Sequence, residues 1–249
     1  MRHPRHRLAL GLVLGFVLVV VVLAAAIGAG LFLNDTAKPA SIEDAVHRFQ
    51  TGGARAGTVG GVYLYATGGG ESVDALGGAH HRYPATTSIT AVGVPCGLKL
   101  RWDALVGRST TWTLCSTPAG VELSSAEVVH TFFGQADRTT YTCTGTVLLQ
   151  AGPFKCGSQR GSEAGRVTLV GHAAVPVGGR TVNVLHVRTV AQVTGGDHGT
   201  ETVDWWLSTA SGLPVKLVLS SRTSRPFALG KVHYREDADL QLLSTTPKR

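Results

Sequence analysis

The sequence predicts a mainly β protein, an antiparallel meander with two short helices, preceded by one N-terminal transmembrane helix. Three observations support this prediction. Residues 8–33 form an apolar run without a charge. From Val62 onward, apolar and polar residues alternate in short runs separated by turn residues, the pattern of antiparallel strands. The 32 glycines fall between these runs and form no repeat, which favours a turn-rich β protein.

The apolar run is long enough to span a bilayer, because its 26 residues exceed the roughly 20 that the hydrocarbon core requires. Residues 1–7 contain three arginines and no acidic residue. The positive-inside rule therefore predicts a cytoplasmic basic tail and a C-terminal part outside the plasma membrane. A cleaved signal peptide, cut near residues 24–26, is the alternative. The apolar run continues through Phe32, which favours an uncleaved single-pass anchor.

The charge balance argues against a nucleic-acid partner. The formal net charge is +7, and without the three N-terminal arginines the chain keeps 20 basic and 16 acidic residues, a net charge of +4. No cluster of Lys and Arg and no stripe of basic and aromatic residues stands out, so nucleic acid is not expected. Roughly 200 residues remain after the anchor, enough for one substantial core.

The four cysteines all follow the apolar run, on the side of the membrane where disulfides persist. They allow three pairings. We favour Cys96–Cys115 and Cys143–Cys156, because each pair brackets one predicted hairpin or loop. A zinc site would need closely spaced C-x-x-C pairs, which the sequence lacks. Neither a metal ion nor another cofactor is therefore expected.

The first disulfide requires an irregular backbone just before its strand. Five apolar residues of this region alternate with polar ones: Leu98, Leu100, Trp102, Trp112 and Leu114. Burying all five on one face pairs even-numbered with even-numbered positions, which places Cys96 and Cys115 on opposite faces. The bridge fits only if residues 94–97 depart from the strand, and they contain a proline and a glycine.

A short amphipathic helix is predicted within a linker of residues 34–61. Ser41 is the expected N-cap, acidic residues follow it, and Gly52 ends the helical pattern. A second short helix is predicted over residues 124–134, where Ser124 and Glu127 form a capping-box pattern. Apolar pairs four residues apart support this second helix: Val128 with Phe132, and Val129 with Phe133.

The remainder of residues 62–249 is expected to form one extracytoplasmic antiparallel domain. Residues 62–76 are predicted to form a strand, a glycine-rich turn and a second strand. Further turns are expected at residues 178–179 and 195–199. The acidic segment 235–239 is expected on a solvated strand edge, where charge discourages aggregation.

The hairpin of residues 202–219 carries two adjacent tryptophans. The expected register pairs Leu207 with Leu213, Trp205 with Val215, Val203 with Leu217 and Asp204 with Lys216. Trp205 is then a core residue on a wholly apolar face. Trp206 lies on the other face against Pro214, either covered by another element or lining a groove for an apolar ligand. Trp206, Pro214, Phe132 and Phe133 are therefore the candidate ligand-binding residues.

The strand "GRTVNVLHVRTV" and the hairpin "TETVDWWLSTASGLPVKLVL" that follows it carry a resemblance to a known family. This stretch resembles the half-barrels of the periplasmic lipoprotein-carrier type. The resemblance implies a curved antiparallel sheet wrapped around apolar helices, with a cavity for acyl chains. The chain also resembles uncharacterised membrane-anchored envelope proteins of high-GC Gram-positive bacteria. That second likeness implies an envelope location and is carried by "DALGGAHHRYPATTSIT", "RWDALVGRSTTWTLC", "HTFFGQADRTTYTC" and "VHYREDADLQLLSTTP".

Common catalytic motifs are missing from the sequence. It contains no G-x-S-x-G, no H-E-x-x-H and no glycine-rich phosphate loop with its lysine, so an enzyme is not expected. His80 and His81 are adjacent, and adjacent strand residues point to opposite faces, which disfavours joint metal binding.

The sequence therefore favours a membrane-tethered binding module for an apolar ligand or lipid, held between the sheet and the helices of residues 41–50 and 124–134. The alternative is a structural or protein-interaction domain of the cell envelope with a protein partner and no small ligand. A hydrolase is the third and weakest hypothesis.

Overall fold

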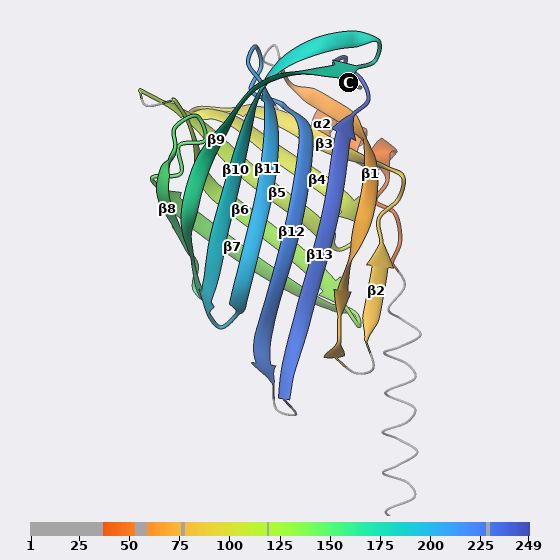
Figure 1. The fold of residues 1–249 in the computed structure, drawn as a ribbon. Helices are drawn as coiled ribbons and strands as arrows, with labels where there is room; N and C mark the ends of the chain where they lie inside the picture. Colours follow the sequence, from red (N-terminus) through yellow and green to blue (C-terminus); the bar gives the residue numbers. More distant parts are fainter. Residues whose placement is uncertain (1–36, 53–58, 76–77, 119, 228–229) are drawn as a thin grey trace, which may run out of the picture. The chain divides into compact units, whose positions relative to one another are not determined.

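The computed structural model describes residues 37–52, 59–75, 78–118, 120–227 and 230–249 (Figure 1). The expected basic tail and transmembrane helix lie outside the described residues. Within the described part, no helix is both long and apolar enough to cross a membrane. The main body comprises Ala37–Thr131 and Ala136–Arg249, and Phe132–Gln135 fall in a separate unit.

The described elements are one helix and thirteen strands. They are α2 (Ile42–Thr51), β1 (Gly61–Val73), β2 (Ala79–Arg82), β3 (Thr86–Val94), β4 (Gly97–Leu105), β5 (Arg108–Thr117), β6 (Gly120–Phe132), β7 (Gln135–Thr144), β8 (Gly152–Gly157), β9 (Gly161–Val177), β10 (Arg180–Gly195), β11 (His198–Ser208), β12 (Pro214–Phe227) and β13 (Gly230–Leu242). The predicted class, a mainly β antiparallel meander, is confirmed.

The sheet curves into a near-ring because its first and last long strands pair with each other. From β3 to β13, consecutive strands lie side by side, and β13 also pairs with β1 (Figure 1). On its other edge β1 pairs first with β3, through residues 61–66, and then with β2, through residues 70–73. The acidic segment 235–239 is therefore not a strand edge, as the sequence suggested, since β13 is paired on both sides.

The glycines of β1 permit this close pairing. A Cβ atom on Gly69 would lie 1.9 Å from the carbonyl oxygen of Asp237 on β13, and one on Gly70 would lie 2.3 Å from that of His81 on β2. Glycine inside a strand commonly marks such close backbone approach. The prediction of a turn here is wrong, because residues 61–73 form one continuous strand.

Helix α2 confirms the first predicted helix and lies on the outer face of the sheet. The side chain of Ser41 accepts a hydrogen bond from the Asp44 amide, the expected N-cap. Ala45 and Phe49 pack against Val62 of β1. The next strand residue, Tyr63, belongs to the main core on the inner face, so α2 and the core occupy opposite faces of β1.

The second predicted helix is wrong, because residues 120–132 form β6, which pairs with β5. The same β-branched and aromatic residues that sit four apart also suit a strand, and strand pairing decides between the two. The cavity expected between the sheet and two helices is therefore not formed as predicted. Phe132 ends β6, and Phe133 follows it with a positive φ of 52°.

The tryptophan hairpin keeps its predicted faces but not its predicted register. Trp205 lies opposite Leu217, and Trp206 lies opposite Lys216, with a bulge between Trp206 and Leu207. The pairing of Trp205 is displaced by two residues from the expected one, and an even displacement leaves each side chain on its predicted face. The expected Asp204–Lys216 pairing is wrong, since Val218 lies opposite Asp204.

Both predicted disulfides are confirmed. The even-with-even register holds, with Leu98 opposite Leu114, and Cys96 lies just before β4, where Gly97 is opposite Cys115. The bridge thus uses the irregular segment that the sequence required. Cys143 and Cys156 lie directly opposite each other on β7 and β8. Two disulfides indicate an extracytoplasmic compartment for this domain.

One end of the inner face is closed by the protein's own side chains. Trp102 and Trp205 are buried there, and the ring of Trp112 meets that of Trp205 edge to face at 5.2 Å. The β9–β10 hairpin bends over this end of the sheet, beyond a bulge between His186 and Val187 (Figure 1). Val177, near the tip of the hairpin, is buried in the main core.

Candidate functional site

A row of polar residues crosses the inner face below this apolar end. In the strand register His81 lies opposite Glu71, Glu71 opposite Glu236, Glu236 opposite Ser221, and Ser221 opposite Glu201. Their positions alternate in step with the core residues of the same strands, so all five side chains point inward. Glu236 and Glu201 flank one intervening strand, which separates their backbones by about 10 Å.

The inner face becomes more accessible beyond this row. Toward the apolar end, Leu217 and Leu240 have no exposed surface. Beyond the polar row in the other direction, Thr223 and Tyr234 face inward and are only half-buried. The inner face is therefore filled at its apolar end and reached by solvent at the end that carries the titratable side chains, here called the open end.

Arg108 of β5 links the two glutamates of β1 and β13. Its Nη2 lies 2.6 and 2.7 Å from the two carboxylate oxygens of Glu236, and its Nε lies 3.5 Å from Oε2 of Glu71. Burial opposes the positive charge, but the surrounding acidic groups, Glu236 foremost, together outweigh it and hold the pKa of Arg108 above its usual range. A charge-assisted bidentate pair of this kind fixes both side chains.

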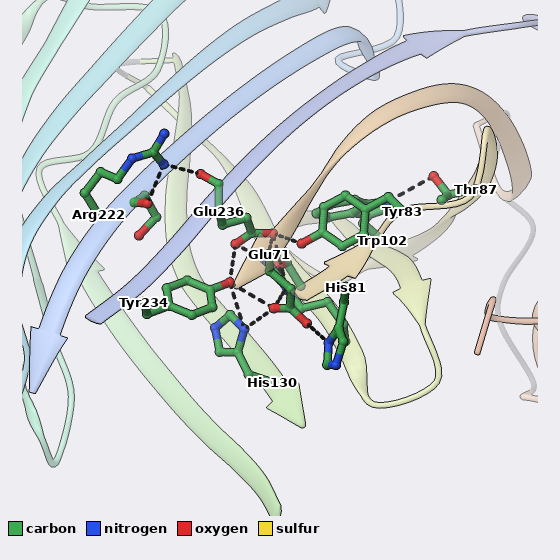
Figure 2. Close-up of polar contacts among 12 residues, drawn as sticks. Glu71, His81, Tyr83, Thr87, Trp102, His130, Arg222, Tyr234 and Glu236 are labelled. Atoms are coloured by element: carbon green, nitrogen blue, oxygen red, sulfur yellow. Dashed lines mark hydrogen bonds and ion pairs between the residues drawn. The ribbon is translucent and has the colours of Figure 1, made fainter. Parts of the chain in front are cut away.

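Glu71 lies at the centre of the network and is fully buried (Figure 2). Its Oε1 lies 3.1 Å from Nδ1 of His81, and its Oε2 lies 3.1 Å from Nδ1 of His130 on β6. Burial alone would raise the pKa of this carboxyl. The hydrogen bonds from both imidazoles and the charge of Arg108 lower it instead, to about 2.

Two tyrosines complete the network around Glu236. Tyr83 donates a hydrogen bond of 2.5 Å to Oε1 of Glu236, and the hydroxyl of Tyr234 lies 2.8 Å from its Oε2 (Figure 2). Burial first, and then the negative charge of Glu236, raise the pKa of both phenols above their usual range. Both tyrosines therefore act as neutral hydrogen-bond donors.

A second group of acids faces the open end from β9 and β11. Glu163 and Glu201 both point inward, and the hydroxyl of Tyr141 on β7 bonds to Glu163. Burial raises the pKa of Glu163, and burial together with the charges of Glu163 and Glu236 raises that of Glu201. Within the described residues no Arg or Lys forms an ion pair with either carboxyl.

Ion pairs bridge the rim of the open end. Arg225 of β12 contacts Asp197 at 2.7 Å and Asp137 of β7 at 3.1 Å, and Arg160 also pairs with Asp137. The pair of Arg225 and Asp137 joins β12 to β7, which are not neighbours in the strand order. The two arginines hold the pKa of Asp137 below its usual value, although burial acts in the opposite direction.

The residues predicted from the sequence are not part of this network. Trp206 lies on the outer face, stacked on His186 with ring centroids 4.0 Å apart, and Lys216 lies over its ring. Pro214 is buried, and its carbonyl accepts a hydrogen bond from Tyr65. Phe132 lies at the end of β6 and Phe133 in the following turn.

Sequence reasoning missed Glu71, Arg108 and Glu236, although a usable pattern was present. Counting in steps of two from the core residue Tyr65 reaches Glu71, and counting back from Leu240 reaches Glu236. A charge at an inward position of an otherwise apolar strand face indicates either a buried ion pair or a site.

The network can donate and accept protons and hydrogen bonds, but it offers no metal centre. Among the described residues, no group of three or more His, Cys, Asp and Glu side chains is arranged to hold a metal ion. A groove of about 450 Å³ between α2 and the C-terminal residues lies elsewhere and is lined largely by exposed side chains. The inner face is therefore the stronger candidate site.

Comparisons with known proteins do not identify a family. No protein-family model, no curated protein and no solved structure matches the chain.

Proposed function

We propose that this domain is an extracytoplasmic binding module that holds a small ligand at the open end of its inner face. One observation carries the proposal. Along β12 and β13 the inward side chains change from fully buried and apolar, at Leu217 and Leu240, to half-buried and polar, at Thr223 and Tyr234. Concave sites that combine an apolar floor with a few placed polar groups are typical of ligand binding.

The side chains of the open end favour a ligand with a polar group over the wholly apolar ligand expected from the sequence. Side chains of the protein fill the apolar end, where Trp102 and Leu217 have no exposed surface. An acyl chain could enter only by displacing them. The inward side chains of the open end, by contrast, are half-buried and polar, and they include His130, Tyr141 and Glu201.

The proposal is tested by blocking the open end with one bulky side chain. Thr223→Trp fills the inner face beside Tyr234, and Thr200→Trp places the same residue on the outer face of the adjacent strand, as the matched control. The full chain is purified with its disulfides intact, and native mass spectrometry records any bound small molecule. We expect a co-purifying mass on the unchanged protein and on Thr200→Trp, and its loss from Thr223→Trp.

A protein that carries no small molecule in any of these forms, but co-purifies with a stable protein partner, would overturn the proposal. That result would favour the alternative, a structural or protein-interaction domain of the envelope. Equal retention of the ligand by both tryptophan variants would place the ligand elsewhere on the molecule and would equally contradict a site at the open end.

A further inference from the structure

The buried carboxylate of Glu71 fixes which nitrogen of His130 carries a proton. The low pKa of Glu71 makes it an ionised acceptor, and Nδ1 of His130 lies 3.1 Å from its Oε2. An unprotonated Nδ1 would place a lone pair against a negative oxygen. Nδ1 therefore carries the hydrogen and donates it to Glu71, so Nε2 is the nitrogen left to accept when the ring carries a single proton.

The position of Tyr234 agrees with this assignment. Its hydroxyl lies 3.1 Å from Nδ1 of His130, 3.0 Å from Oε2 of Glu71 and 2.8 Å from Oε2 of Glu236 (Figure 2). One hydroxyl has a single proton, which the shortest contact gives to Glu236. The contact between His130 and Glu71 then needs its own proton, and only Nδ1 can supply it.

Of the two histidines that contact Glu71, His130 is the one that reaches the open end. The side chain of His81 is 5% exposed, whereas that of His130 is 24% exposed. The ring of Tyr234 packs against that of His130 at 4.6 Å and 64°, which holds the imidazole in place. His130 contacts Glu71 and Tyr234 through Nδ1, and among the described residues its Nε2 has no hydrogen-bond partner.

The surrounding charges define the donor that this acceptor fits. Four carboxyl groups face inward here. Glu71, Glu236 and Glu201 share the polar row, and Glu163 lies one inward position beyond it. Arg108 is the cation that pairs with Glu71 and Glu236. An anionic group would meet repulsion here, and a cationic N–H donor would be attracted. A protonated amine combines a donor for Nε2 with the charge that the carboxyl groups favour.

We propose that Nε2 of His130 accepts a hydrogen bond from an alkylammonium group of the ligand. This inference rests on the proposed function and names the chemical class of the ligand at that site. Glu71 is the positioning residue, since it orients the imidazole from behind in the way that a buried carboxylate orients a ligating or catalytic histidine.

Three probes of equal chain length separate charge from apolar contact. Hexylammonium, hexanol and hexanoate are titrated into the full, disulfide-bonded chain by calorimetry. We expect hexylammonium to bind most tightly and hexanoate most weakly. His130→Phe keeps an aromatic ring without the acceptor and should weaken hexylammonium binding at least tenfold. His233→Phe is the matched control, because His233 makes the same Nδ1 contact with a carboxylate, Asp74, at an exposed position.

Nitrogen-15 NMR of the histidines keeps the test decisive if His130→Phe fails to fold. The unchanged protein should show His130 with a protonated Nδ1 and an unprotonated Nε2, and hexylammonium should shift the Nε2 resonance. A protonated Nε2 in the free protein, equal affinity for hexanoate, or unchanged binding by His130→Phe would overturn the inference. If Thr223→Trp still abolishes binding of the co-purified ligand, the failure concerns the ligand class alone and not the binding function.

Discussion

The acid sensitivity of folding should depend on Glu71. Its pKa is lowered from 4.5 to about 2 in the folded protein, where the side chain is fully buried. Each tenfold change in proton affinity corresponds to about 1.4 kcal/mol, so this carboxylate contributes about 3 kcal/mol to the free energy of unfolding. Because the folded pKa is depressed, the contribution is present above the unfolded pKa and is lost as the pH falls from about 5 to about 2.

Glu71→Gln removes the ionisable carboxyl, so the variant lacks this contribution at neutral pH. Because glutamine does not titrate, the stability of the variant does not fall for this reason in acid. His81 and His130 contact different oxygens of Glu71, and in glutamine one of these positions is an NH2 donor, so the amide cannot accept both hydrogen bonds in this geometry. We expect the variant to be less stable than the unchanged protein by about 3 kcal/mol at pH 7, and the two to converge near pH 2. Urea unfolding of both proteins across this pH range measures the difference.

Glu127→Gln is the matched control for this prediction, because Glu127 pairs with Arg138 on the outside of the sheet and its side chain is 28% exposed. We expect the control to change stability by less than about 1 kcal/mol at every pH. Parallel stability curves for Glu71→Gln and the unchanged protein would refute the reasoning, since they would show that Glu71 does not bind its proton more weakly in the folded state.

Three further predictions concern the closure, the core and the second group of acids. Gly69→Ala should destabilise by more than about 1 kcal/mol in urea unfolding, because its Cβ would lie 1.9 Å from a backbone oxygen, whereas Gly68→Ala has open space and should not. Trp205→Ala should cost about 3–5 kcal/mol and Trp206→Ala clearly less, since only Trp205 is fully buried. Glu201→Gln should raise the melting temperature at pH 8 but not at pH 4. The folded pKa of Glu201 is raised, and its unfavourable ionisation grows as the pH rises.

Local patterns were sufficient for elements that local interactions determine. The N-cap at Ser41 and the following amphipathic residues correctly predicted α2, because a cap and its helix are contained in ten residues. The disulfide pairs were also correct. Residues 124–134 satisfied the same helical rules, but residues 124–132 belong to strand β6, because pairing with β5 is a tertiary interaction that no short window contains.

Closure of the sheet and assembly of the polar network could not be predicted in the same way. Tyr65 pairs with Leu242 across most of the domain, and this contact decides that β13 has no free edge. Period-two alternation identifies which side chains face inward, including Glu71 and Glu236. The alternation does not show that Glu71 and Glu236 lie opposite each other, or that Arg108 from β5 contacts both. These contacts depend on the relative register of strands that are distant in the sequence.

The accessibility of the open end is the central claim, and chemical labelling of the histidines tests it most directly. Diethyl pyrocarbonate acylates an accessible neutral imidazole, and mass spectrometry of the digested protein locates each modification. His130 should be modified while His81 is protected, and the co-purified ligand should protect His130 as well. Equal protection of both histidines in the ligand-free protein would show that the network is a sealed core, and it would contradict a binding site at the open end.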